Sequence, residues 1–582
     1  MNDENDGFLY HPLDNIEDAD IFETAIDRRV FNRKLAPERP YTYWTLELYD
    51  QTNGIRGGGG LGVLAADTRR VAEQVKVPFV LITPFYPSET HQKWQDGQII
   101  DDHIPVNYRK FGFKLVGEVS VKCCGNTCKL DVVEKKFGST RIVSVTEPNF
   151  GELYSGLSGG DHRLYQEVCL GFGGYQALKL LGLKPAIMQL NEVATFFAAL
   201  VRLDELASNG MDFYEAMVYT RKHTLYTNHT LVQAAEADFS LEQFERFVFP
   251  NLKSKPTKKW LRDKFVDGRI RLSDITIEIA ELRSGVSKLH ARVANYHDIA
   301  GERVKFKAIT NGIDMEKWIM PEIMRFYHEN DILDEFYMPT MNFTENLKAL
   351  SYEQIASFKG MGRAILNHVL ASRPDQNGQT VRFNDTELIF DFKRRFVDYK
   401  RPQLPFKDPV RLRKILEKYN AHYILAGRVH TGDTRMAGIL AEVLTIVNSD
   451  DYLRTHVHYI ADYDEELAYA LSVGSNISIN VPIVGLEACG TSWEKDIANL
   501  DLLISTHDGG VADGSMDNYL NVHGLSEEEE VLELYRRMEE AGEAWKGKLG
   551  AENMIQKQLA GFLPVISGTR MLKDYLDYLL PE

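Results

Sequence analysis

Apolar and polar positions follow two patterns along the C-terminal half of this chain. Short apolar runs typical of buried strands occupy residues 386–392, 423–429, 458–463 and 502–506. Stretches with apolar residues at every third or fourth position, typical of helices, follow two of these runs at 434–447 and 464–472. Strands that alternate with helices predict a parallel, doubly wound sheet, and therefore an α/β fold.

The N-terminal half carries a similar pattern. Strand-like runs lie at 43–49, 80–84, 185–192 and 224–230, and alternating runs between 113 and 145 predict antiparallel hairpins. A glycine run from Gly57 to Gly60 follows the first strand-like run and leads into a helix that continues through Val75. Glycines at the start of a helix let the backbone approach a ligand closely, although a flexible turn is the simpler interpretation.

The composition of the chain favours a globular protein and argues against several classes of function. The chain has 582 residues, of which 44% are hydrophobic and 26% charged, as in a globular protein with room for two large domains. Its formal net charge of −17 argues against general binding to nucleic acid or acidic membranes, so an anionic substrate would need a local basic pocket. Since the first six residues are acidic and no apolar run approaches the roughly 20 residues of a membrane span, we expect no signal peptide and no membrane segment.

The five cysteines indicate a reducing compartment. An odd and sparse set in so long a chain is typical of a cytoplasmic protein. Cys123, Cys124 and Cys128 are closely spaced, but no second ligand pair stands at metal spacing, and Gly125-Asn126 marks a hairpin turn. We therefore expect no metal site.

Two stretches carry candidate chemistry. In the first, Gly490, Thr491 and Ser492 can present backbone N–H groups and a hydroxyl at a helix N-terminus, and Lys495 follows on the first helical turn. An ordinary β–turn–α unit with a solvated lysine would look the same. The second is the run 393–401, with five cationic side chains in nine residues. It is either a solvated basic loop or a clamp for phosphate, since arginine offers paired donors and lysine a point charge.

A resemblance decides between these alternatives. Glu487-Ala-Cys-Gly-Thr-Ser-Trp-Glu-Lys495, continuing to Asn499 and to Ser505-Thr506-x-Asp508-Gly509, resembles the cofactor-lysine segment of the α-glucan (glycogen, starch and maltodextrin) phosphorylases. Other segments resemble motifs of that family in unbroken order: Thr45-Leu-Glu-Leu-Tyr49, Gly59-Gly-Leu-Gly62, Leu190-Asn-Glu192, Tyr226-Thr-Asn-His-Thr230, Thr310-Asn-Gly-Ile313 and Arg394-Arg-x-x-Asp-Tyr-Lys-Arg401. The resemblance covers most of the chain.

The resemblance implies a fold and an activity. The fold is two Rossmann-like, doubly wound domains facing a cleft, the GT-B type of glycosyltransferase; with a break at the Asn311-Gly312 turn, we expect domains 1–313 and 314–582. The activity is phosphorolysis of α-1,4-glucan or maltodextrin from the non-reducing end, giving glucose 1-phosphate with retention. Its partners are glucan and inorganic phosphate, and the enzyme is cytoplasmic and dimeric. The cofactor is pyridoxal 5′-phosphate, carried by Lys495 as a Schiff base, and its phosphate is the acid–base partner of the substrate phosphate.

The resemblance also implies roles for individual residues. The catalytic set, which holds phosphates or lies beside the glucosyl group, is Arg394, Arg395, Lys400 and His229. The cofactor-binding set is Lys495, Tyr49, Gly59, Gly60, Trp318, Tyr463, Gly490 and Thr491. The substrate-binding set is Leu61, Asn191, Glu192, Asn311, Glu487 and Cys489.

Two departures from the family pattern keep other functions open. The family usually has a histidine two residues after Leu190-Asn-Glu192, where this chain has Ala194, and smaller or uncharged residues at Trp493-Glu494. One rival is a retaining transferase of the same fold that uses a nucleotide sugar. Such enzymes often carry a second glutamate eight residues after the first, where this chain has Lys495. The other rival is a degenerate, non-catalytic glucan-binding relative.

Overall fold

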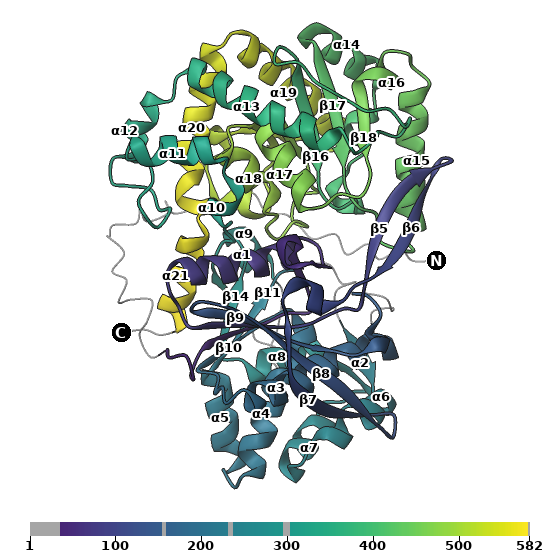
Figure 1. Cartoon of the computed structure of the whole chain (residues 1–582), viewed down its shortest axis with the longest axis vertical. Coiled ribbons are helices and arrows are strands. Elements are labelled where there is room, and N and C mark those ends of the chain that lie inside the picture. Colours follow the sequence, from purple (N-terminus) through teal and green to yellow (C-terminus); the bar gives the residue numbers. More distant parts are fainter. Residues whose placement is uncertain (1–34, 154–158, 231–236, 295–302, 580–582) are drawn as a thin grey trace.

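Strand pairing divides the chain into two main sheets, each with helices on both faces (Figure 1). The computed structural model describes residues 35–153, 159–230, 237–294 and 303–579. The acidic N-terminal residues 1–6 considered above lie outside this described part. In Figure 1 the nine-stranded sheet lies in the lower half of the molecule and the six-stranded sheet in the upper half.

The nine-stranded sheet is mostly parallel. Its strands, in spatial order, are β15 (Lys307–Ala308), β14 (Leu282–Gly285), β11 (Thr224–Asn228), β10 (Ile187–Asn191), β1 (Tyr41–Trp44), β4 (Phe79–Pro84), β9 (Thr140–Thr146), β8 (Asn126–Phe137) and β7 (Lys114–Cys123). Pairing is parallel from β15 to β9 and antiparallel between β9, β8 and β7. The predicted hairpins between 113 and 145 are therefore confirmed. The order of the parallel strands reverses between β1 and β10, and ligands of doubly wound sheets bind at such a point.

The six-stranded sheet is wholly parallel. Its spatial order is β18 (Val457–Ile460), β17 (Ala421–Ala426), β16 (Leu388–Lys393), β19 (Ile477–Asn480), β20 (Leu502–Thr506) and β21 (Leu520–Val522). Numbered along the chain, this is 3-2-1-4-5-6, the order of a doubly wound dinucleotide-binding sheet. The reversal falls between β16 and β19. The alternation of strands and helices in the sequence thus correctly predicts a parallel α/β fold.

Helices cover both sheets. Those of the N-terminal half are α1 (Gly60–Gln74), α2 (Asp161–Val168), α3 (Gly174–Leu180), α4 (Phe196–Ser208), α5 (Phe213–Lys222), α6 (Leu241–Phe247), α7 (Lys255–Arg262), α8 (Leu272–Ile279) and α9 (Lys288–Val293). Those of the C-terminal half are α10 (Met315–Trp318), α11 (Pro321–Glu329), α12 (Phe343–Asn346), α13 (Tyr352–Leu370), α14 (Pro409–Tyr419), α15 (Thr434–Asn448), α16 (Leu453–His456), α17 (Glu465–Gly474), α18 (Ser492–Ala498), α19 (Glu527–Lys546), α20 (Leu549–Ile566) and α21 (Gly568–Leu579). Two-stranded ladders pair β2 (Leu48–Asp50) with β3 (Ile55–Gly57), β5 (Ser88–Gln95) with β6 (Gln98–Pro105), and β12 (Asp238–Ser240) with β13 (Arg269–Arg271).

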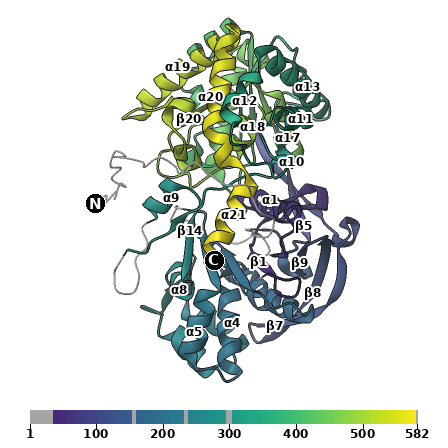
Figure 2. The ribbon, with the colours of Figure 1, turned by 90° about the vertical axis from the view of Figure 1, so that its left-hand side faces the viewer.

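Side chains of β1 alternate between two hydrophobic cores. Tyr41 and Tyr43 belong to one core, and Trp44 belongs to the core on the other face, as the two-residue period of a strand requires. The first core also contains Leu572 and Tyr575 of α21. In Figure 2 this C-terminal helix comes down from the six-stranded sheet and lies beside α1. The last helix of the chain therefore completes the core of the first sheet.

One predicted element is wrong. The run 43–49 is not a single strand, because the structure ends β1 at Trp44 and begins β2 at Leu48. Between them the Thr45 hydroxyl accepts a hydrogen bond from Glu47 N at 3.1 Å and donates to Glu47 O at 3.0 Å. This local side-chain-to-backbone turn competes with the extended ladder, as threonine hydroxyls can. The helix predicted after the glycine run is confirmed as α1.

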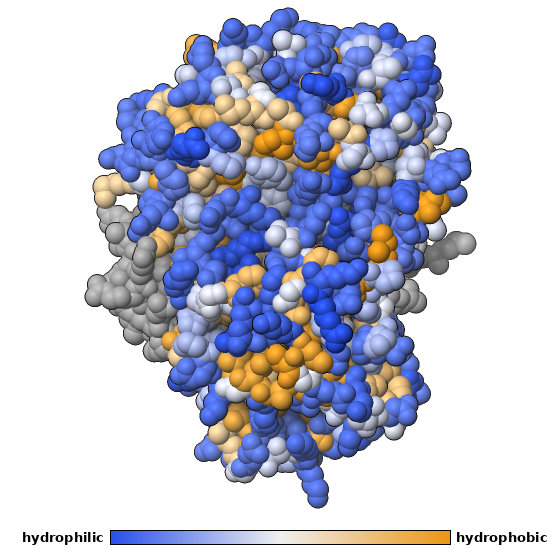
Figure 3. All heavy atoms as spheres, in the orientation of Figure 1, coloured by the Kyte–Doolittle hydropathy of each residue, from blue (hydrophilic) through white to orange (hydrophobic). Residues whose placement is uncertain are grey.

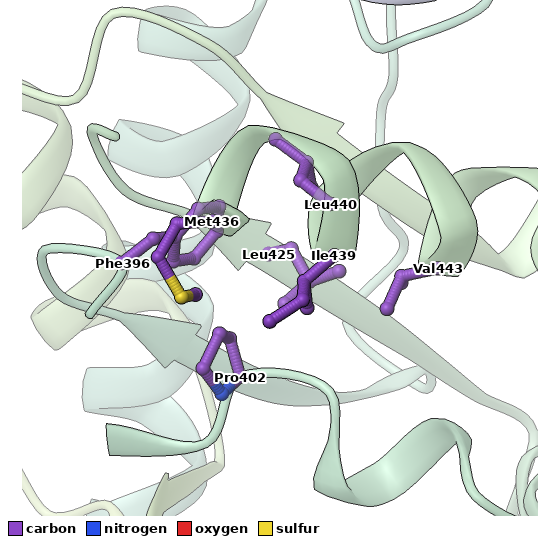
Figure 4. A pocket seen from close by; sticks show the side chains of 7 residues that line it. All are labelled: Phe396, Pro402, Leu425, Met436, Ile439, Leu440 and Val443. Carbon is purple, nitrogen blue, oxygen red and sulfur yellow. The ribbon is translucent and has the colours of Figure 1, made fainter. Parts of the chain in front are cut away.

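The surface is predominantly hydrophilic on the face shown in Figure 3, with separate apolar patches. Across the residues that the structure describes, no helix is both long enough and apolar enough to cross a bilayer. A small apolar pocket of about 10 Å³ lies between α15 and the loops after β16 (Figure 4). It is lined by Phe396, Pro402, Leu425, Met436, Ile439, Leu440 and Val443. A void of this size with no polar lining is a packing gap rather than a ligand site.

Buried charged side chains form a network between β16 and α18. Lys393 Nζ, at the end of β16, lies 2.6 Å from Asp391 Oδ2 and 2.7 Å from Asp496 Oδ1 of α18. Asp496 also accepts hydrogen bonds from Ser472 at 3.0 Å and Ser478 at 2.5 Å. Burial alone would lower the pKa of Lys393, but Asp391 and Asp496 outweigh it and raise that pKa. The network therefore fixes the end of β16 against α18.

Removing the cation from this network tests its importance. We expect Lys393→Met to lower the free energy of unfolding by about 3–5 kcal/mol, because it leaves buried carboxylates without their counter-charge. Urea denaturation at pH 7 measures the loss. The control Lys348→Met removes an exposed partner of Glu345 and should leave the midpoint where it is in the wild type. Equal midpoints for the two variants would contradict the assignment.

Candidate functional site

The ends of β16 and β19 carry a buried guanidinium with unused donors. Arg394 follows β16 directly, and its Nη1 donates to Asn480 Oδ1 at the end of β19. The side chain is 4% exposed, and its Nε and Nη2 atoms have no hydrogen-bond partner. Among the described residues, no carboxylate lies within ion-pair distance of it. Because a buried cation without a counter-charge is costly, this geometry favours an anion as its ligand.

Two further cations of the same run lie near Arg394. Lys400 Nζ lies 3.0 Å from Glu487 Oε2. Burial lowers the pKa of Lys400, and the charges of Arg394 and Arg395 lower it further, while Glu487 opposes both effects. The remaining cations of the run have structural partners: Lys393 is held by Asp391 and Asp496, and Arg401 donates to the carbonyls of Val481 and Pro482 and pairs with Glu530.

The glycine run before α1 lies close to Arg395. A Cβ atom on Gly59 would stand 3.6 Å from Arg395 Nη1, so the loop backbone and the guanidinium are in close proximity. Gly59 N donates to Glu47 Oε2 at 2.8 Å, which fixes the loop. Gly60 and Leu61 are the first residues of α1, and a Cβ on Gly60 would meet open space. Polar backbone of one sheet thus faces the basic run of the other.

Polar side chains end the two strands β10 and β11 of the first sheet. Asn191 Nδ2 donates to Trp44 O at 3.0 Å, and the ring of His229 donates through Nε2 to Asn191 Oδ1 at 2.9 Å. Glu192 Oε1 accepts from His229 N at 3.1 Å and from the Thr230 hydroxyl at 2.6 Å. Burial lowers the pKa of His229 to about 3 and raises that of Glu192 to about 7. The imidazole is therefore neutral.

Glu192 also has unusual backbone geometry. Its φ of 66° lies in the left-handed region, where residues with a side chain are uncommon. The conformation turns the carboxylate back toward the following strand end, where it holds the backbone of His229. Strain of this kind is found where a functional geometry requires it.

Lys495 lies on α18 with its amine against an indole. Its side chain is buried, and Nζ lies 3.5 Å from the centroid of the Trp318 ring. Within the described part of the chain, the amine has no carboxylate at ion-pair distance. Burial lowers its pKa to about 8, with Asp67 opposing. An amine that loses its proton near neutral pH is suited to attack a carbonyl group.

Four further residues of the predicted cofactor-binding set have the following surroundings. Gly490 and Thr491 lead directly into α18, and a Cβ on Gly490 would lie 3.5 Å from Glu487 Oε1. The Tyr49 hydroxyl is buried and has no hydrogen-bond partner. The Tyr463 hydroxyl donates to Lys393 O at 3.3 Å.

Asn311 and Cys489 join the two sheets. Asn311 Nδ2 donates to Cys489 O at 3.2 Å, and Ser287 Oγ donates to the neighbouring Ala488 O at 2.8 Å. Burial raises the pKa of the Cys489 thiol well above its usual value, so the thiol is protonated. Both contacts hold the loop before α18 against the first sheet.

Comparison with known proteins identifies the family. The sequence model of the carbohydrate phosphorylase family matches residues 183–565, which is well over half of the chain. The chain belongs to the carbohydrate phosphorylase family. It is 24% identical to a maltodextrin phosphorylase of Thermococcus litoralis, over 93% of this chain and 70% of that protein. It is 25% identical to a glycogen phosphorylase of Aquifex aeolicus, over 89% of this chain and 83% of the relative. The predicted resemblance is confirmed.

Sequence reasoning assigned no role to three residues that hold groups of this candidate site. Asn480, Glu47 and Asp508 hold Arg394, Gly59 and the backbone of Glu487, respectively. Burial raises the pKa of Asp508 to about 7. Asn480 ends an apolar run, and a polar residue at the carboxyl end of a parallel strand was the available signal. Nothing in the local pattern of Glu47 indicates its partner.

The two unused nitrogens of the Arg394 guanidinium lead to a prediction about phosphate binding. We expect Arg394→Gln to weaken the binding of inorganic phosphate by about tenfold to a hundredfold, because it removes charge-assisted donors worth roughly 1.5–3 kcal/mol. Isothermal titration with phosphate measures the change. Arg435→Gln is the matched control, since Arg435 is exposed and pairs with Asp398. Equal phosphate affinity in wild type and Arg394→Gln would contradict the assignment.

The raised pKa of Glu192 leads to a prediction about how the stability of the protein depends on pH. Its pKa of about 7 in the folded protein exceeds the ordinary value of 4.5, so the folded state holds the extra proton between these values. Its contribution to stability therefore falls as the pH rises through this range. Glu192→Gln keeps the oxygen that accepts both hydrogen bonds and cannot ionise. Relative to wild type, the variant should gain about 1–3 kcal/mol between pH 5 and pH 8 in urea denaturation. A constant difference across that range would refute the shift, and Glu215→Gln, at an exposed site, serves as control.

Proposed function

We propose that this protein is an α-glucan phosphorylase, which uses inorganic phosphate to release glucose 1-phosphate from the non-reducing end of α-1,4-glucan or maltodextrin. The observation that carries the proposal is the buried Arg394 guanidinium with two unused nitrogens. It lies in a protein of net charge −17, beside two more cations of the same run. Positive charge is therefore concentrated at this site although the protein as a whole is acidic, as the binding of an anion requires. The names of the phosphorylase relatives support the same activity.

We further propose that the two sheets are the cores of two domains, 1–313 and 314–582, whose strand-order reversals face each other across the substrate site in the GT-B manner. Three contacts support this arrangement: Gly59 with Arg395, Asn311 with Cys489, and Ser287 with Ala488. Helix α21 belongs to the second domain in sequence and packs on the first.

The residues around Lys495 fit pyridoxal 5′-phosphate. The cofactor offers an aldehyde and a phosphate, and this region offers a buried amine with a lowered pKa and a guanidinium with unused donors. Lys495 would hold it covalently, while Tyr49, Gly59, Gly60, Trp318, Tyr463, Gly490 and Thr491 would surround it. When bound, it would supply a phosphate monoester whose second pKa near 6 suits proton exchange near neutral pH.

The chain's own residues bind and orient the reactants. Arg394, Arg395 and Lys400 neutralise the phosphate charge, and the buried Arg394 acts most strongly because it lies away from water. Glu487 holds Lys400 and offers its carboxylate to glucosyl hydroxyls.

The strand ends of the first sheet complete the sugar-binding side. His229 donates through Nε2 to Asn191, so its Nδ1 is left to accept a hydrogen bond from a sugar hydroxyl. Glu192 fixes the backbone of His229, and Leu61 at the start of α1 borders the glucosyl group. Asn311 and Cys489 act by holding the loop before α18 in place.

The two apolar side chains among the sequence departures, Ala194 and Trp493, are accommodated by core packing. Trp493 is 1% exposed and its ring contacts Phe562 with centroids 5.1 Å apart, within the core of the second sheet. Ala194 is also buried in a hydrophobic core. Ala194 and Trp493 place no charged group at the site, so they give no support to a non-catalytic relative. Glu494 is a buried carboxylate whose pKa burial raises, with Arg570 and Lys495 opposing that rise. Lys495, at the position where nucleotide-sugar transferases carry a glutamate, disfavours the other rival. The resemblance extends the proposal to a cytoplasmic homodimer.

Trapping of the cofactor tests the proposal. After borohydride reduction of the full-length protein with pyridoxal phosphate, peptide mass mapping should find a pyridoxyl adduct on Lys495, and the Lys495→Arg variant should show none at that position. The wild type should release glucose 1-phosphate from maltodextrin and phosphate, and Lys495→Arg should lose this activity at least a thousandfold, because it lacks the attachment point. An unmodified Lys495, or turnover of a nucleotide sugar in place of phosphate, would refute the proposal.

A further inference from the structure

Helix α1 contributes a buried carboxylate to the surroundings of Lys495. Asp67 is 1% exposed, and its Oδ2 accepts a hydrogen bond from the indole Nε1 of Trp318 at 2.8 Å. Its Oδ1 accepts from Arg70 Nη1 at 3.1 Å, and the same guanidinium donates to Asp50 at 2.7 Å. Both carboxylate oxygens are therefore held by hydrogen-bond donors.

The indole that Asp67 holds is the one against which the Lys495 amine rests. The hydrogen bond at Nε1 restricts rotation of the ring, whose face lies 3.5 Å from Lys495 Nζ. A second cation, Lys317 Nζ, lies 4.4 Å from the same ring and is paired with Glu465. The aromatic face attracts both cations, and its orientation decides where the amine of Lys495 points.

Asp67 also acts on Lys495 through its charge. Burial is the main cause of the low pKa of Lys495, about 8, and Asp67 is the first of the charges that oppose it. Lys317 lowers this pKa, while Glu465 and Asp496 raise it to a smaller extent than Asp67. The carboxylate of α1 thus offsets part of the desolvation of the amine without forming an ion pair with it.

We propose that Asp67 is a positioning residue for Lys495: its carboxylate holds the Trp318 indole against the amine and supplies a fixed negative charge beside it. The three residues come from helices α1, α10 and α18. The contacts therefore link α1, the helix after the glycine loop, to Lys495 on α18. Its relevance to a cofactor rests on the proposed function, but the contact chain itself does not.

The experiment measures the pKa of the Lys495 amine in the cofactor-free, full-length chain. Competitive acylation with acetic anhydride from pH 6 to pH 10, read by peptide mass spectrometry, reports this value and needs neither cofactor nor substrate. Asp67→Asn keeps an oxygen for the indole N–H and removes the charge, so the pKa of Lys495 should fall by about one unit. Asp67→Glu keeps the charge and should leave the value near that of the wild type.

A second variant separates the hydrogen bond from the charge. Trp318→Phe keeps an aromatic ring but has no N–H, so the pKa should move less than in Asp67→Asn, while the limiting acylation rate at high pH should rise severalfold as the ring loosens. Asp314→Asn is the control, because the buried carboxylate of Asp314, at the start of α10, accepts a hydrogen bond from Gln74 and none from the Trp318 indole.

The outcomes are distinct. An unchanged Lys495 pKa in Asp67→Asn, or an equal fall in Asp314→Asn, would overturn the role of Asp67. Failure to trap pyridoxal phosphate on Lys495 would instead refute the proposed function, and the acylation result would still decide whether Asp67 positions the amine.

Discussion

The buried ion pair between Lys393 and Asp496 is the interaction on which the candidate site depends. Lys393 immediately precedes Arg394, and Asp496 immediately follows Lys495, so one pair at 2.7 Å fixes the backbone beside both groups. The network extends to Asp391 on the same strand and to the serines of α17 and β19. Because buried charges must stay paired, the end of β16 and helix α18 cannot separate without a large cost in free energy.

The site combines the edges of two doubly wound sheets. In each sheet the strand order reverses near its centre, and polar residues follow the strands at that point: Asn191 in one sheet, and Arg394 with Asn480 in the other. Apolar side chains fill both faces of each sheet, so chemistry is confined to the strand ends. Contacts between the two halves include the hydrogen bonds of Asn311 to Cys489 and of Ser287 to Ala488.

Charge is distributed to suit an anionic reactant in an acidic protein. The chain carries a net charge of −17, yet Arg394 is buried and Lys400 is half-buried, with Glu487 as the carboxylate paired to Lys400. Burial also makes His229 neutral and lowers the pKa of Lys495 to about 8. These effects share one physical cause, the removal of water from polar groups, and they have the same sign because both groups are cations when protonated.

Local sequence was sufficient for the parallel α/β fold, the glycine loop before α1, the lysine of α18 and the basic run from Arg394. Each of these features is visible within a short stretch of sequence, as apolar periodicity, glycine placement or clustered charge. The single strand expected at 43–49 failed because the Thr45 hydroxyl bonds to the nearby backbone of Glu47. Tertiary structure alone decided that Lys393 and Arg401 are structural while Arg394 keeps unused donors, and that Asp67 reaches Lys495 through Trp318. Such partners lie tens to hundreds of residues apart, and burial depends on the whole chain, so no local pattern could specify them.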